Sequence, residues 1–258
     1  TPSLVAGSAF EGMMEENGLD PTTVEGARET AYALPNYKVS VHQMETKVPV
    51  LWWRSVGHTH TGYVLETMMD ELLDKAGRDP VDGRLALMGE SPRDAGALRR
   101  VAELADWGRR PAEGHAYGVA VHKSFGTYVA QIADVSLEDG RPRVHKVWCA
   151  VDCGVAVNPD IIRAQMEGGI GFATGAVLFD AIDLGEGGRP LQANWDTYRM
   201  IRMNEMPEVE VAIIDSDESP TGVGEPGVPP TGPAIANAMR RLTGQVPRQL
   251  PIVTPVEV

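Results

Sequence analysis

The stretch Thr221-Gly-Val-Gly-Glu-Pro-Gly-Val-Pro-Pro-Thr-Gly-Pro-Ala-Ile-Ala-Asn-Ala-Met-Arg240 decides how the rest of the chain is interpreted. It places a single carboxylate, Glu225, in a loop of glycines, which allow sharp bends, and prolines, which stiffen the backbone. Small and apolar residues after Pro233 predict a helix that begins near this proline. We therefore expect a rigidly held acid beside a helix N-terminus that can face an anion. The alternative is a simple turn whose Glu225 points into water.

A second informative region runs from Val151 to Gly171 and predicts a strand, a turn at Asn158-Pro159 and then a helix. The helix carries Gln165 and then Gly168 and Gly169, each of which costs about 1 kcal/mol relative to alanine inside a helix. Such glycines indicate a close neighbour, which is either another backbone or a cofactor.

In a third region, Arg54 follows an apolar stretch and begins the run Arg54-Ser-Val-Gly57. The guanidinium group is always charged and matches the geometry of carboxylates and phosphates. Either Arg54 contacts a ligand, or it stacks on Trp52 or Trp53.

These motifs resemble those of the molybdenum hydroxylases, the xanthine oxidase family. The run Gly222-Val-Gly-Glu-Pro-Gly-Val-Pro-Pro resembles the family's catalytic-glutamate motif, and Gln165-Met-Glu-Gly168 resembles its Gln-x-Glu-Gly motif. Nearly the whole chain is similar to the C-terminal part of the large subunit, of the isoquinoline 1-oxidoreductase beta-subunit or aldehyde oxidase type. Arg54-Ser-Val-Gly57 departs from the Arg-Gly-Phe-Gly run of xanthine oxidase at its second and third positions.

The resemblance implies a molybdenum hydroxylase that oxidises an aldehyde or an N-heterocycle with water as the oxygen source. Glu225 is then the base for the molybdenum-bound hydroxyl, and Arg54 orients or polarises the substrate. Gln165 contacts the pterin of the cofactor, and Gly168, Gly169 and Gly224 line the cofactor site. The expected cofactor is molybdopterin with molybdenum, in the cytosine dinucleotide form.

The same resemblance implies partners. We expect the N-terminal part of the large subunit, a small subunit with [2Fe–2S] clusters, and a cytochrome or another electron acceptor. The alternative is a non-catalytic fragment or interaction module that binds no cofactor alone. Molybdenum analysis with and without the co-expressed N-terminal part separates the two. The compartment stays open between cytoplasm and periplasm, because any export signal precedes these residues.

Composition excludes some classes of function. A net charge of −13 and a pI near 4.9 argue against nucleic-acid binding, which relies on clustered lysine and arginine. The two cysteines, Cys149 and Cys153, are too few for a zinc or iron–sulfur site, and buried free thiols are the expected state. His58 and His60 share one face only on a strand, so no metal site is predicted there.

Periodicity predicts an α+β fold. The resemblance implies that residues 1–48 are a connecting segment, with one strand predicted at 37–44, and that residues 49–258 form the molybdenum-cofactor-binding domain. Alternating patterns predict four further strands. Helical spacing predicts five helices in residues 49–258, counting the one that follows Pro233, besides a short helical piece that ends at Gly18. The strands lie near 118–124, 127–137, 144–153 and 208–215, and the other helices near 61–76, 80–88, 92–107 and from 160 onward.

Overall fold

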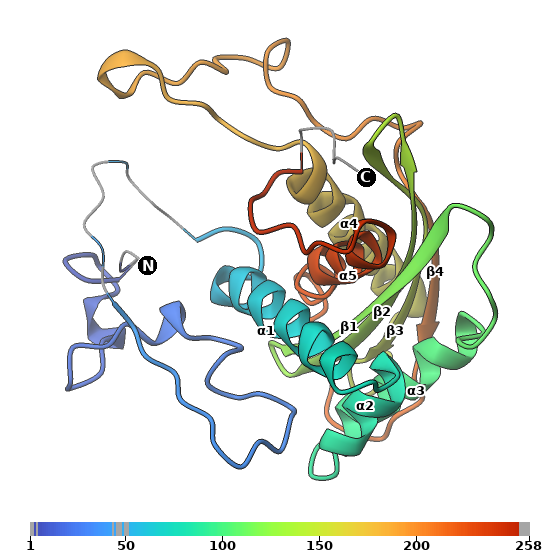
Figure 1. The fold of residues 1–258 in the computed structure, drawn as a ribbon. Helices are drawn as coiled ribbons and strands as arrows, with labels where there is room; N and C mark the ends of the chain where they lie inside the picture. Colours follow the sequence, from blue (N-terminus) through green and yellow to red (C-terminus); the bar gives the residue numbers. More distant parts are fainter. Residues whose placement is uncertain (1–2, 4, 43, 45–47, 49–51, 253–258) are drawn as a thin grey trace.

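The computed structural model describes residues 3, 5–42, 44, 48 and 52–252. A four-stranded sheet lies at its centre in the order β1-β2-β3-β4 (Figure 1). The three strands β1 (His115–Ser124), β2 (Thr127–Glu138) and β3 (Arg141–Asp152) form consecutive antiparallel hairpins, and β4 (Glu208–Ile213) adds parallel to β3. The predicted α+β class and these four strands are confirmed.

Two-residue turns set the register of the hairpins. Phe125 and Gly126 join β1 to β2, and Asp139 and Gly140 join β2 to β3, all four with positive φ. Such turns match the twist of paired strands. The predicted turn at Glu138-Asp-Gly140 is therefore confirmed, and the break at Ser124-Phe-Gly126, which the sequence left open, is the tip of a hairpin.

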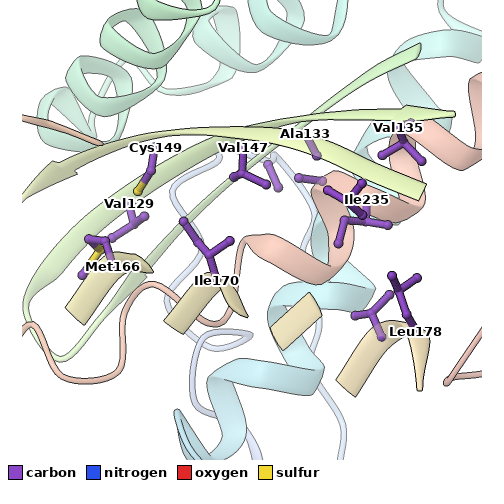
Figure 2. Close-up of a cluster of buried hydrophobic side chains, with 14 of the residues drawn as sticks. Val129, Ala133, Val135, Val147, Cys149, Met166, Ile170, Leu178 and Ile235 are labelled. Atoms are coloured by element: carbon purple, nitrogen blue, oxygen red, sulfur yellow. The ribbon is translucent and has the colours of Figure 1, made fainter. Parts of the chain in front are cut away.

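Helices cover both faces of the sheet. On one face lie α4 (Pro159–Leu178) and α5 (Thr231–Thr243), whose apolar side chains meet those of β2 and β3 in the cluster that Figure 2 shows. On the other face lie α2 (Pro80–Leu87) and α3 (Pro92–Leu104), together with apolar residues from the second half of α1 (Val56–Lys75). Side chains alternate along β2, so that Val129 and Ala133 join the first cluster while Ala130 and Ile132 join the second.

A buried ionic cluster fixes α1 against α2 and β1. Arg84 of α2 is fully buried and donates to Glu66 Oε2 at 3.0 Å and to Asp70 Oδ1 at 3.2 Å. Glu66 Oε2 also accepts the Val121 amide of β1 at 3.0 Å, and Glu66 Oε1 accepts the Tyr32 hydroxyl. Burial by itself lowers the pKa of Arg84, but the neighbouring negative charges outweigh it and raise the pKa above its usual value.

The strand predicted at 37–44 is wrong for the residues described there, 37–42 and 44, which form neither helix nor strand; residue 43 lies outside the described part. Alternating polarity makes a strand only where a neighbour can pair with it, and Tyr37 and Val39 are exposed with no strand beside them. Two short 3-10 helices, η1 (Glu11–Met13) and η2 (Pro21–Thr23), are present instead.

The N-terminal segment nevertheless packs on the rest of the chain. Ala33 N–H donates to Leu87 O at 2.8 Å, and Tyr32 reaches Glu66. The boundary between residues 48 and 49 stays a proposal, and residue 49 itself lies outside the described part.

Between α4 and β4, residues 180–206 form a long arm (Figure 1, yellow to orange, at the top), whose regular structure is a 3-10 helix, η3 (Glu186–Gly188), and one isolated bridge. The arm exposes large apolar side chains, among them Trp195, which is 70% exposed, and Met203, which is 93% exposed. No helix in the described part of the chain combines the length and hydropathy needed to cross a membrane.

Candidate active site

The loop that carries Glu225 is tied to β2 at both ends. At its start, Thr127 Oγ1 donates to Gly222 O at 2.7 Å. At its end, Gln131 Nε2 donates to Gly227 O at 2.9 Å and Gln131 Oε1 accepts from Thr231 Oγ1 at 2.7 Å. Gln131 is fully buried, so water does not compete for these bonds. Thr127 and Gln131 of β2 thus add to the rigidity of the Glu225 loop, which its glycines and prolines had predicted.

Glu225 is half-buried and is held by Ser55. The Ser55 amide donates to Glu225 Oε1 at 2.9 Å, and the Ser55 hydroxyl donates to the Glu225 carbonyl at 2.7 Å. The same carbonyl accepts the Val228 amide at 2.9 Å. Oε2 makes no hydrogen bond within the described residues. The chain therefore orients the carboxylate and leaves one oxygen for a ligand.

The backbone that presents the Ser55 amide is strained. Ser55 has φ of 74° and Val56 has φ of 47°, a region that β-branched residues rarely enter. Gly57 has no room for a side chain, because a Cβ there would lie 2.2 Å from Thr22 O. The xanthine-oxidase-type run has glycine where this chain has Ser55, and glycine adopts positive φ freely. Here two hydrogen bonds to Glu225 stabilise the conformation instead.

Arg54 directly precedes Ser55 and lies beside the Ser55–Glu225 contact. Its Nε donates to Gly224 O at 2.9 Å, and its Nη2 donates to the same carbonyl and to Gln165 Oε1 at 3.2 Å. The guanidinium carbon lies 5.7 Å from the ring centroid of Phe172 on α4. Stacking thus occurs, but on Phe172 and not on the two tryptophans considered from the sequence. Nη1 makes no hydrogen bond within the described residues.

The predicted site residues Arg54, Gln165, Gly168 and Gly224 lie together. A Cβ added at Gly168 would lie 4.0 Å from Arg54 Nη1, and one at Gly224 would lie 3.9 Å from Gln165 Oε1, so both exposed glycines lie at contact distance from the polar side chains of the site. Gly169 is different, since a Cβ there would lie 3.2 Å from the backbone of Gly227. The close approach that Gly169 allows is therefore with the chain itself, and its role in cofactor binding stays a prediction.

The helix N-terminus at the site is not the one expected. Every residue of α5 from Thr231 through Met239 is buried, and Gly232 packs on Tyr63 and Val177. The start of α5 is thus buried within the chain. The helix start that lies beside carboxylates is that of α1, where Glu225 and Glu25 accept backbone amides.

Glu25 is the second carboxylate at that start. Gly57 N–H donates to Glu25 Oε2 at 3.2 Å. Burial raises the pKa of Glu25, the bond from Gly57 lowers it, and the charges of Asp20 and Glu225 raise it, so that the pKa lies above its usual value. Neither Ser55 nor Glu25 was predicted as a site residue, because no local pattern marks either one.

His58 and His60 both lie in α1 and do not share a face. His58 Nδ1 lies 2.9 Å from His122 Nε2 at the end of β1, whereas His60 is exposed. Burial lowers the pKa of His58 to about 4 and that of His122 to about 3. Both rings are therefore neutral at pH 7, and one donates to the other.

Cys149 and Cys153 are buried free thiols in the cluster between the sheet and α4, as expected. Burial raises the pKa of Cys149 to about 12, which keeps this thiol protonated and unreactive.

Comparison with known proteins identifies the family of this chain. A family model described as the molybdopterin cofactor-binding domain matches residues 75–207, just over half of the chain. Gln165, Gly168 and Gly169 lie inside this match, and Arg54 and Glu225 lie outside it.

Two curated relatives extend further along the chain. Isoquinoline 1-oxidoreductase subunit beta of Brevundimonas diminuta is 36% identical over 228 residues, covering 86% of this chain and 29% of the relative. Membrane-bound aldehyde dehydrogenase (pyrroloquinoline-quinone) of Gluconacetobacter polyoxogenes is 31% identical over 222 residues, covering 78% of this chain and 29% of the relative. The chain thus spans less than a third of the length of these relatives.

Among solved structures, quinoline 2-oxidoreductase from Pseudomonas putida 86 matches with a TM-score of 0.70 and 12% identity, covering 78% of this chain and 52% of that chain. At this identity the likeness concerns the fold. The family model and the fold together define an α+β molybdopterin cofactor-binding domain. The chain belongs to the molybdopterin cofactor-binding domain family of the molybdenum hydroxylases.

Proposed function

We propose that this chain supplies the base, a substrate-facing arginine and part of the cofactor site of a molybdenum hydroxylase. The enzyme oxidises an aldehyde or an N-heterocycle with water as the oxygen source. The observation that carries the proposal is the array around Glu225, in which Ser55 holds Oε1, Oε2 stays open, and Arg54 and Gln165 lie alongside. The names of the relatives, an isoquinoline oxidoreductase and an aldehyde dehydrogenase, support both substrate classes.

The residues present fit a pterin cofactor. Gln165 Nε2 makes no hydrogen bond within the described residues and can donate to a pterin or phosphate oxygen. Gly168 and Gly224 are exposed and add no side chain of their own beside Arg54 and Gln165. A flat heterocycle can approach such a surface closely. We propose molybdopterin in its cytosine dinucleotide form, and Gln165, Gly168, Gly169 and Gly224 as the residues that hold it.

The bound molybdenum cofactor supplies the oxygen-transfer and redox chemistry. Within this chain, Glu225 accepts a proton on Oε2, since Oε1 is committed to the Ser55 amide. Arg54 donates from Nη1 to an oxygen or a ring nitrogen of the substrate, because its Nε and Nη2 are committed to Gly224 and Gln165. The bonds from Arg54 and Ser55 join the two groups into one unit, so the donor and the base keep a constant separation.

The enzyme needs partners to complete this site and to remove electrons. We propose the N-terminal part of the large subunit, a small subunit with [2Fe–2S] clusters, and a cytochrome or another acceptor beyond it. The buried thiols Cys149 and Cys153 cannot ligate a cluster while they stay in the core. The arm of residues 180–206, with Trp195 and Met203 exposed, is a suitable surface for one of these protein partners.

Replacement of the base tests the proposal. In the assembled enzyme, Glu225→Gln keeps the shape and the oxygen that accepts the Ser55 amide but removes the proton acceptor. Turnover is expected to fall by about 10²–10⁴-fold at unchanged molybdenum content. The matched control is Glu218→Gln, an exposed glutamate just before the loop, which should leave turnover unchanged. Near-normal turnover of the Glu225→Gln enzyme at full molybdenum loading contradicts the catalytic assignment.

A further inference from the structure

Two glutamates that are far apart in the sequence cap the first turn of α1. Ser55 N–H donates to Glu225 Oε1 at 2.9 Å, and Gly57 N–H donates to Glu25 Oε2 at 3.2 Å. Amides in the first turn of a helix have no intrahelical acceptor, so they need one from elsewhere. The Ser55 side chain does not cap the helix. The acceptors therefore come from Glu25, just after η2, and from the Glu225 loop.

The segment that carries Glu25 is fixed on α1 by close contacts. A Cβ on Gly57 would lie 2.2 Å from Thr22 O and 3.1 Å from Glu25 Cβ, so the two backbones touch. A Cβ on Gly26 would lie 2.7 Å from both Thr61 Oγ1 and His122. Thr61 Oγ1 donates to the carbonyl of Glu25. These contacts leave the segment little freedom to shift, and they hold the Glu25 carboxylate at the start of α1.

We propose that Glu25 is a positioning residue for Glu225, acting through the first turn of α1 and through its negative charge. Glu25 holds the Gly57 amide and so fixes the strained turn whose Ser55 amide orients the base. Its charge lies at the same helix start as that of Glu225. The inference rests on the proposed role of Glu225 as the base, and it assigns a second carboxylate to the same site.

The charge of Glu25 also makes its hold on the helix depend on pH. Burial, and after it the charges of Asp20 and Glu225, raise the pKa of Glu25 above its usual value. Protonation of Glu25 therefore begins at a higher pH than for an ordinary glutamate, and it weakens the bond that Glu25 accepts from the Gly57 amide. A variant that keeps the oxygen but cannot titrate holds the first turn of α1 to lower pH.

Other charged and titratable groups also lie at this helix start. Asp20, before η2, raises the pKa of Glu25 in the same direction as Glu225 does. Arg54 brings a positive charge to the carbonyl of Gly224, next to the base. His58 in the first turn of α1 is neutral near pH 7, because burial lowers its pKa to about 4. The pKa of His60, in the next turn, is also lowered.

The test is the pH dependence of kcat/KM in the assembled, molybdenum-loaded enzyme. Glu25→Gln keeps an oxygen for the Gly57 amide and removes the charge, so the acid limb should move to lower pH by about 0.3–0.7 unit. The plateau should stay within about twofold of the parent. Glu25→Asp keeps the charge but shortens the reach, so the acid limb should stay in place while the plateau falls several-fold. The position of the acid limb thus reports the charge of Glu25, and the height of the plateau reports its hydrogen bond to the Gly57 amide.

Glu16→Gln makes the same charge change at an exposed glutamate of the same segment and should not shift the profile. Superposable profiles for the parent and the Glu25→Gln enzyme, or an equal shift in the Glu16→Gln enzyme, overturn the inference. Glu225→Gln is measured in parallel. If it leaves turnover near normal, the proposed function fails; if it abolishes turnover while the Glu25 variants match the parent, only the role of Glu25 fails. Should Glu25→Gln not load molybdenum, the plateau of Glu25→Asp decides, and a parental plateau refutes the inference.

Discussion

Two replacements of Ser55 distinguish the effect of its strained backbone from the effect of its hydroxyl, which holds Glu225. Ser55→Ala removes the hydroxyl that donates to the Glu225 carbonyl at 2.7 Å, but it keeps a Cβ at φ of 74°. Ser55→Gly removes the same hydroxyl and also removes the Cβ, so the turn loses its steric strain. Both variants keep the Ser55 amide that donates to Oε1.

The magnitudes follow from these contacts. The carbonyl of Glu225 keeps the Val228 amide as a donor at 2.9 Å, so it is not left unsatisfied. Ser55→Ala should therefore lower the free energy of unfolding by about 1 kcal/mol, the net value of one hydrogen bond. In Ser55→Gly, release from the left-handed region restores about 1 kcal/mol, and the stability should stay near that of the parent. Turnover should fall about fivefold in both, because about 1 kcal/mol of positioning is lost in each.

The assays are urea unfolding and steady-state turnover at matched molybdenum content, with Ser219→Ala as the control at an exposed serine. The two variants should differ in stability but agree in turnover. Equal stabilities refute the assigned strain at Ser55. Parental turnover in both variants refutes the role of the hydroxyl in holding Glu225.

Two further predictions concern the ionic cluster and the cofactor site. Arg84→Met leaves Glu66 buried without its guanidinium partner, whereas Asp70 keeps Arg241 at 3.0 Å, and it should lower the free energy of unfolding by about 3–5 kcal/mol in urea titrations. At the exposed Arg78, the same change should cost less than about 0.5 kcal/mol, and equal losses would refute the role of the cluster. Gln165→Ala should lower the molybdenum content of the purified complex by about five- to tenfold, because a polar contact to the cofactor is lost, while stability falls by only about 1 kcal/mol. Mass spectrometry of the metal measures this, and an unchanged content excludes Gln165 from the cofactor site.

The sequence alone predicted the elements whose signals are local. The turn at Asp139 and Gly140 and the alternation around it predicted the hairpin of β2 and β3, since turn chemistry and a period of two act within a few residues. The helices α2 to α5 followed from helical spacing in the same way. The motif around Glu225 predicted the position of the acid and the stiffness of its loop.

Sequence predictions were wrong, or missing, for elements that depend on residues far away in the chain. Alternation over 37–44 predicted a strand, but none of the strands in the described part of the chain pairs with this segment. The start of α1 was placed five residues late, at Thr61, because the helix has no local side-chain cap and its acceptors are Glu25 and Glu225. The start of α5 looked open in sequence and is buried in the structure.

The candidate site shows the same division. Glu225, Arg54 and Gln165 could be named from their motifs, but only the tertiary structure joined them to Ser55 and Glu25. The bonds that do so link residues 32, 111 and 170 positions apart. Such contacts form only after the sheet and α1 have brought distant segments together, and short-range patterns carry no information about which amide a distant carboxylate will meet. The sequence therefore determined which groups can do chemistry, and the fold decided which oxygen of Glu225 is left free to do it.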